Sequence, residues 1–275
     1  MITDFLSVYN YIRERLLEYN IEEVGYCNLN EVDTSVPSRK LALLPKSGSV
    51  ICILAPFYIG KKEERNIAYY AMSNDYHVLM GNILDTITSE LRGKYPQNIF
   101  YGFVDTSPIN EVRLAASCGL GVIGKNTQLL TKKYGSYCFI CEIVTDIECK
   151  SLDIEPQPCI GCNRCILACP TGAINENGLN AELCRSELTQ KKKELSLWER
   201  EQIKDGGYVW GCDICTEVCP YNTKPLETKL DMFKHNINPI VTRENCDELI
   251  AVKSYGWRGK KVILRNLGIL EENKN

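Results

Sequence analysis

The sequence lacks an excess of charge of either sign. Its 275 residues include 32 Lys and Arg against 35 Asp and Glu, which gives a formal net charge of −3. Long-range electrostatics alone therefore do not draw the chain to nucleic acid or to an anionic membrane surface. Any contact with nucleic acid must come from a local basic patch.

The sequence also has no apolar run of membrane-spanning length. Its longest run, SVICILAPFYIG from Ser49 to Gly60, is much shorter than the roughly 20 residues that a spanning helix requires. The first ten residues, MITDFLSVYN, contain Asp4 and no basic segment of the kind that opens an export signal. We therefore expect a cytoplasmic protein with no membrane partner.

A dinucleotide-binding fingerprint is absent as well, because no G-x-G-x-x-G follows a strand-like segment. No internal repeat occurs beyond two cysteine runs. The composition is 44% apolar and 24% charged, which is ordinary for a folded protein. The chain is long enough for one large domain with a sizeable core and a smaller module.

Hydrophobic periodicity predicts an α+β fold. Apolar residues at helical spacing indicate a first helix, capped by Thr3 and ending near Asn20, and a second helix from Tyr76 that Gly93 terminates. Short apolar segments rich in branched residues predict buried strands at SVICILAP, FYGFVD and SYCFICEIVTD.

A short helix is predicted between the last two of these strands. Ser107 is a natural N-cap, Pro108 suits the first helical position, and Gly119 can end the helix. With Ser107 as the cap, Asp105 is left free at the carboxyl end of FYGFVD, where α/β folds commonly bind ligands. An Asx-turn or a cap is the alternative role for Asp105.

Fifteen cysteines are present, and eight of them lie between Cys159 and Cys219. In a long chain without an export signal, this clustering favours metal or cluster ligation over a disulfide scaffold. The run from Cys159 has the bacterial ferredoxin spacing C-x2-C-x2-C-x3-C-P, in which the fourth cysteine ligates the other of two clusters. The run from Cys212 holds only C-x2-C-x3-C-P, and the upstream Cys184 completes it.

We therefore predict two [4Fe-4S] clusters in which each Cys-Pro cysteine crosses to the other set. The predicted ligands are Cys159, Cys162, Cys165 and Cys219 for one cluster and Cys184, Cys212, Cys215 and Cys169 for the other. Paired structural zinc is the alternative, because C-x2-C also occurs in zinc knuckles, but zinc spacings lack the doubled Cys-Pro signature.

The remaining seven cysteines show no comparable ligand spacing. We expect them to be small buried apolar residues: Cys27, Cys52, Cys118, Cys138, Cys141, Cys149 and Cys246.

Glycine and proline become frequent around the cysteine runs, as expected where ligands rather than an apolar core fix a loop-rich module. We therefore place a domain boundary near Ser151. The predicted domains are 1–150, an α/β domain that binds substrate or a second cofactor; 151–225, a double-cluster domain; and 226–275, a helical segment that packs on both.

Several segments together resemble the epoxyqueuosine reductases, the cobalamin-dependent iron-sulfur enzymes of tRNA queuosine synthesis. In chain order they are LLPKSGSVICILAPFY, SNDYHVL, VDTSPINEVRLAASCGLGVIGKNTQLLT, GSYCFICEIVTD, both cysteine runs and YGWRGKKVILRNLGIL. The matches extend from about Leu43 to Leu270. They are specific to the family because the motifs occur together, in the same order and at similar spacings.

The resemblance implies a nitroreductase-like domain that binds cobalamin, followed by a bacterial ferredoxin-like double [4Fe-4S] module that delivers electrons. It implies that epoxyqueuosine in tRNA is reduced to queuosine and that Asp105, in the position of the family's proton donor, protonates the departing epoxide oxygen. Such a carboxyl must be kept partly protonated near neutral pH, by burial or by a neighbouring charge.

The same positional matching places further residues at the corrin beside Asp105. These are Lys125, Asn126, Leu129 and Ile140. Ordinary core packing is the alternative for Leu129 and Ile140, and a solvated charge is the alternative for Lys125. His77 matches a family DYH segment, but a histidine on a helix face is more often structural than a cobalt ligand.

The sequence departs from the family at its end. The family continues into a C-terminal module of helical repeats that grips tRNA, whereas this sequence stops soon after Leu270, which weakens tRNA as the expected partner. Basic residues that can contact phosphate, or form a solvated face, are Lys191, Lys192, Lys193, Arg258, Lys260, Lys261 and Arg265.

We expect a monomeric oxidoreductase supplied by an external low-potential electron donor of the ferredoxin or flavodoxin type. Two alternatives remain. One is a corrinoid reductase of a small molecule, like the reductive dehalogenases, which use a tyrosine donor. The other is a non-catalytic ferredoxin-type electron carrier, which leaves Asp105 unexplained.

Overall fold

The computed structural model describes residues 4–35, 38–150, 152, 154 and 157–272. The chain forms two compact units. Unit 1 contains the residues up to Pro56, Tyr76–Gly124 and Gln128–Cys159, and unit 2 contains Phe57–Asp75, Lys125–Thr127 and the residues from Ile160. The boundary expected near Ser151 lies outside the described residues, and the division at 150 and 225 stays a prediction.

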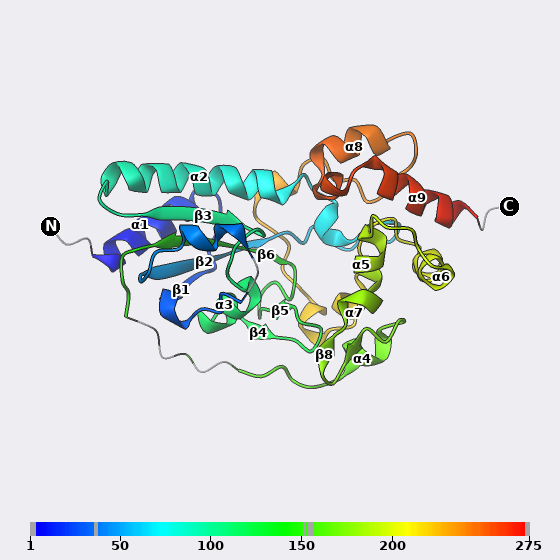
Figure 1. Ribbon diagram of the computed structural model, residues 1–275, viewed down its shortest axis with the longest axis horizontal. Coiled ribbons are helices and arrows are strands. Elements are labelled where there is room, and N and C mark those ends of the chain that lie inside the picture. Colours follow the sequence, from blue (N-terminus) through cyan, green and yellow to red (C-terminus); the bar gives the residue numbers. More distant parts are fainter. Residues whose placement is uncertain (1–3, 36–37, 151, 153, 155–156, 273–275) are drawn as a thin grey trace. The chain divides into compact units, whose positions relative to one another are not determined.

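Unit 1 is built on an antiparallel sheet with the strand order β1-β2-β6-β3 (Figure 1). Its strands are β1 (Val24–Asn28), β2 (Ser49–Pro56), β3 (Phe100–Val104) and β6 (Cys138–Thr145). The three strands predicted from apolar segments are therefore confirmed as β2, β3 and β6. Every residue of β2 is buried, as its uninterrupted apolar run requires. The mixture of helices with this sheet confirms the α+β class.

Helices cover both faces of this sheet. On one face lie α1 (Phe5–Leu17) and α2 (Tyr76–Lys94): the ring of Phe5 meets that of Tyr26 in β1, and Leu84 of α2 lies directly over Gly102 in β3. On the other face, α3 (Glu111–Ser117) shares a buried apolar cluster with Cys52 of β2. A hairpin of β4 (Val122–Ile123) and β5 (Leu129–Leu130) follows α3.

The ends of α1 and α2 differ slightly from those predicted. Thr3 lies outside the described residues, and the side chain of Asp4 caps α1. Helix α2 runs to Lys94, so the prediction that Gly93 ends it was wrong by one residue.

The predicted cap of α3 was wrong, because Asn110 rather than Ser107 caps the helix and accepts from the N–H of Arg113 in its first turn. Ser107 instead accepts from the Ile109 N–H in the buried turn before the helix. The end at Gly119 is confirmed: its φ of +73° is a left-handed conformation that glycine adopts without strain.

Unit 2 consists of short helices and one small hairpin. Its elements are α4 (Arg164–Ala168), β7 (Ile174–Asn175), β8 (Gly178–Leu179), α5 (Arg185–Gln190), α6 (Leu197–Gly206), α7 (Ile214–Glu217), α8 (Cys246–Val252) and α9 (Lys260–Glu271). Leu188, Ile203 and Ile269 form a small core between α5, α6 and α9. The buried Asn266 of α9 donates to the carbonyls of Thr189 and Val209.

In the described part of the chain, no helix combines the length and the apolar character needed to cross a membrane.

Candidate functional site

Unit 2 contains the first cysteine run from Cys162 onward and all of the second run, and within it the two runs fold alike. In each, a loop leads into a one-turn helix, α4 or α7, and the helix is followed by a Cys-Pro step. Cys165 lies in α4 and Cys215 in α7, and the two helices pack against each other. The sequence similarity of the runs therefore corresponds to a repeated local structure.

Four thiols of unit 2 are electrostatic neighbours. Burial, and after it the charges of Cys212, Cys184 and Cys169, raises the pKa of Cys215 to about 12. Burial likewise raises the pKa of Cys212 to about 11. These four residues are the set predicted for one cluster, including Cys169, the Cys-Pro cysteine that belongs to the other run.

The thiol of Cys169 lies in a turn that favours the thiolate. Although burial opposes ionisation, hydrogen bonds from the Thr171 hydroxyl and from the backbone N–H groups of Ile174, Thr171 and Ala173 lower its pKa. The thiolate is the form that ligates iron, and N–H donors to the sulfur are the contacts that tune such a cluster. These residues therefore fit an iron-sulfur cluster.

The other cysteines behave as predicted. Within the described residues all seven are buried, except Cys138, which is half-buried. No group of three or more His, Cys, Asp or Glu side chains in this part of the chain is arranged around a single metal ion.

A buried ion pair supports the second cysteine run. Asp213 follows Cys212, and its carboxylate accepts from the Arg65 guanidinium at 2.6 Å and from the Tyr69 N–H at 3.0 Å. The Arg65 and Asp213 side chains are 5% and 8% exposed. Burial raises the pKa of Asp213 to about 6, and the Arg65 charge opposes that rise. The segment from Phe57 thus fixes the loop that presents Cys212.

Replacing Arg65 with Met is expected to lower the free energy of unfolding by about 3–5 kcal/mol, because it leaves the Asp213 carboxylate buried without its counter-ion. Chemical denaturation of the purified chain measures this loss. Lys61→Met is the matched control, since its partner Glu63 is exposed, and it should leave the unfolding curve unchanged. Equal stability of the two variants would show that the pair contributes nothing.

Asp105 lies in unit 1 directly after β3, as predicted. It occupies a three-residue turn, closed by the Thr106 N–H donating to the Val104 carbonyl at 2.7 Å, and its φ is +56°. A non-glycine residue in this conformation is uncommon and is often found at functional sites. Its carboxylate is 57% exposed and lies 3.2 Å from Nε2 of His77. The exposed Asp105 carboxylate can therefore reach a substrate while His77 holds one of its oxygens.

His77 is fixed by aromatic packing. Its ring stacks on Tyr76 at 4.1 Å, and Tyr76 stacks on Phe139 of β6 at 3.8 Å. The histidine of the DYH segment thus orients Asp105 from α2.

Two acidic residues beside Asp105 were missed from the sequence. The Asp105 N–H donates to the carboxylate of Glu111, the first residue of α3, and Glu142 lies fully buried in β6. Glu142 could have been noticed in the sequence, because it is the single acid in the apolar strand pattern CFICEIVT.

The residues expected at a corrin have distinct surroundings. In unit 1, Leu129 belongs to the buried apolar cluster beneath α3, and the half-buried Ile140 packs against the same cluster. In unit 2, Lys125 donates to Asn163 at 2.7 Å and to Glu176 at 2.6 Å, so it is not simply a solvated charge. Asn126 is buried.

The chemistry of these residues fits a corrin. Ile123, 38% exposed, faces Leu129 across the β4–β5 hairpin and adds an uncovered apolar side chain. Apolar side chains suit the flat face of a corrin ring, and a buried amide suits its amide substituents. A role in binding it stays a prediction.

Most of the predicted phosphate-binding residues have partners within unit 2. Lys191 binds Glu199, Lys260 binds Asp247, and Arg265 donates to backbone carbonyls of the lysine run. Arg258 lies over the Trp257 ring at 3.8 Å. The remaining candidates are exposed: Lys192, Lys193 and Lys261.

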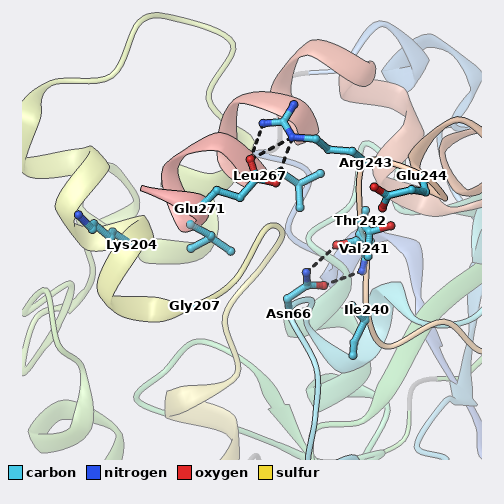
Figure 2. Close-up of a pocket in the computed structure, with 11 residues that line it drawn as sticks. Asn66, Lys204, Gly207, Ile240, Val241, Thr242, Arg243, Glu244, Leu267 and Glu271 are labelled. Carbon is cyan, nitrogen blue, oxygen red and sulfur yellow. Dashed lines mark hydrogen bonds and ion pairs between the residues drawn. The ribbon is translucent and has the colours of Figure 1, made fainter. Parts of the chain in front are cut away.

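Figure 2 shows a pocket of about 460 Å³ in unit 2, lined by Asn66, residues 240–244 and parts of α6 and α9. Its polar groups bind one another: the Asn66 amide pairs with the Val241 backbone at 2.7 and 2.8 Å, and Arg243 pairs with Glu271 at 2.7 Å. Among the described residues, none of those predicted for the site lines this pocket, so we do not assign it to the site.

The fold and the repeated cysteine runs define an iron-sulfur protein with a double-cluster module and a separate α+β unit. A family model for a 4Fe-4S double cluster binding domain matches residues 158–222, and a model described as epoxyqueuosine reductase QueG, DUF1730, matches residues 39–106. The epoxyqueuosine reductase of Bacillus cereus is 30% identical over 281 residues, which cover 94% of this chain and 73% of that protein. The chain belongs to the epoxyqueuosine reductase family.

Solved structures agree with this assignment. An epoxyqueuosine reductase bound to an epoxyqueuosine-modified tRNA stem loop is 28% identical, with a TM-score of 0.77 over 96% of this chain and 81% of that chain. The Bacillus subtilis enzyme, in a structure whose catalytic aspartate loop is swung out of the active site, is 26% identical, with a TM-score of 0.77 over 96% of this chain and 82% of that one. The protein is thus an oxidoreductase of a family that uses cobalamin and [4Fe-4S] clusters.

Proposed function

We propose that this chain reduces epoxyqueuosine in tRNA to queuosine, with Asp105 as the proton donor. The observation that carries the proposal is the position of Asp105, held in a strained turn at the end of β3 with its carboxylate exposed and paired with His77. Support for a tRNA substrate comes from the similar enzyme bound to a modified tRNA stem loop. A tRNA substrate also favours a cytoplasmic location.

The reaction needs protons as well as electrons. Conversion of an epoxide to an alkene with release of water consumes two electrons and two protons. Cobalamin, when bound, supplies the low-valent cobalt chemistry that removes the oxygen. The chain must supply an acid at the departing oxygen, because water is a better leaving group than hydroxide. Asp105 provides that proton, and His77 holds the carboxylate in place.

The proposed ligand sets of the two clusters remain those predicted from spacing. One set is Cys159, Cys162, Cys165 and Cys219, and the other is Cys184, Cys212, Cys215 and Cys169. The mutual electrostatic effects of the second set support its composition. Lys125, Asn126, Leu129 and Ile140 are proposed to hold the corrin. An external low-potential donor of the ferredoxin or flavodoxin type would supply the electrons to a monomeric enzyme.

Anaerobic turnover on three substrates tests this function. The chain, loaded with clusters and cobalamin and given a low-potential reductant, is mixed with an epoxyqueuosine-containing tRNA stem loop, with the free nucleoside, or with a halogenated phenol. The proposal predicts conversion of the stem loop with a kcat/KM above that for the nucleoside, and no dehalogenation. Turnover of the phenol alone would assign a small-molecule reductase, and cluster reduction without any turnover would assign an electron carrier.

A further inference from the structure

Glu142 is a buried acid in the middle of the sheet. Strand register places it opposite Phe103 of β3 and Cys52 of β2, on the face that α3 covers. Its side chain is fully buried, the Ser107 hydroxyl is the hydrogen-bonding group beside it, and no cation pairs with it among the described residues. Burying an acid without a counter-ion is costly, so its place in a central strand calls for a functional explanation.

Glu111, the first residue of α3, interacts electrostatically with both Glu142 and Asp105. One of its oxygens accepts from the Asp105 N–H, and the other, Oε1, is buried without a partner. The turn that exposes the Asp105 carboxylate is therefore tied through its backbone to a second acid beneath it.

Electrostatics keep both acids protonated in the folded chain. Burial and then the charge of Asp105 raise the pKa of Glu111 to about 8, whereas His77 opposes that rise. Burial, and after it the charge of Glu111, raises the pKa of Glu142 well above its usual range, although the Ser107 hydroxyl and the charge of Lys40 oppose this. Two buried thiols are also affected. After burial itself, all three carboxyls raise the pKa of Cys141, and Glu142 and Glu111 raise that of Cys52.

We propose that Glu111 and Glu142 form a buried proton store that reprotonates Asp105 during turnover. This inference rests on the proposed function. After Asp105 gives its proton to the substrate oxygen, Glu111 passes its own proton to the Asp105 carboxylate, and Glu142 restores the proton to Glu111. Each transfer moves one proton between carboxyl groups, and solvent refills the store after product leaves. The store delivers the second proton of the reaction without opening the site to water.

Stability against pH tests the store without cofactors or substrate. A carboxyl whose pKa is higher in the folded than in the unfolded chain binds more protons when folded, so the free energy of unfolding falls as pH rises between the two values. For Glu111 that window runs from about 4.5 to about 8. The melting temperature of Glu111→Gln should therefore fall less between pH 5 and pH 8 than that of the parent chain. Glu148→Gln, at an exposed position after β6, should retain the parent slope.

The pH profile of turnover tests whether the store feeds Asp105. In Glu111→Gln and Glu142→Gln, the alkaline limb of the kcat profile should move to lower pH, with kcat about tenfold below the parent chain at pH 8 and near parent at pH 6. The KM for the stem loop should not change. A uniform loss at every pH would show that these residues only hold the turn, and an unchanged profile would also overturn the proposal.

The Asp105→Asn variant distinguishes a failure of the proposed function of Asp105 from a failure of the proton store alone. If that variant keeps full turnover, the proposed function of Asp105 is wrong. If that variant is inactive while both glutamine variants keep the parent pH profile and the parent slope of melting temperature, the proton store alone is wrong.

Discussion

Replacing Asp105 with Asn is expected to lower kcat by about 10²–10⁴-fold, because an amide has no proton to give to the departing epoxide oxygen. The geometry of the turn should survive, since Asn tolerates positive φ as well as Asp does. The KM for the tRNA stem loop and the iron content should therefore stay at the parent values. Single-turnover kinetics under anaerobic conditions measure the loss directly.

Asp85→Asn is the matched control for this prediction. Asp85 is an exposed residue of α2 in the same unit, and removing its charge should leave kcat unchanged. Full turnover by Asp105→Asn would contradict the assignment and show that another group donates the proton.

Replacing Cys169 with Ser is expected to remove one of the two clusters. Iron should fall from about eight to about four atoms per chain, because a [4Fe-4S] cluster needs four thiolates and Cys169 is proposed to complete the set of Cys184, Cys212 and Cys215. Electron delivery and turnover should be lost with it. Iron analysis of the anaerobically purified variant, with its electron paramagnetic resonance spectrum after reduction, measures the result.

The control for the cluster prediction is Cys246→Ala. Cys246 is buried in α8 and is not a proposed ligand, so this variant should keep about eight irons. Zinc in place of iron in the parent chain, or the full iron content in Cys169→Ser, would contradict the ligand assignment.

Local patterns were sufficient to predict the main elements of unit 1. The all-buried run of β2 and the helical spacing along α2 follow from side-chain periodicity, which depends only on neighbours in the sequence. The cap of α3 was mispredicted because Ser107 and Asn110 are both good caps, and the choice depends on burial of the intervening Pro108 and Ile109.

The candidate site also contains residues that the sequence predicts and residues that only the fold brings together. Spacing within a short run predicts which cysteines are ligands, because the cluster demands that spacing. The acids near Asp105 were not predictable, because the interaction of Glu142 with Glu111 depends on strand register and on the packing of α3, and neither is a property of sequence neighbours. The pairing of Arg65 with Asp213 was hidden for the same reason.

The nucleosides of tRNA in cells that lack their own epoxyqueuosine reductase provide the most direct test of the account. When this chain is expressed in such cells with cobalamin available, mass spectrometry should show queuosine in place of epoxyqueuosine, with the loss of one oxygen atom. Expression of the Asp105→Asn variant should leave epoxyqueuosine in place. Persistence of epoxyqueuosine in cells that contain the parent chain with its iron and cobalamin bound would contradict the proposed function.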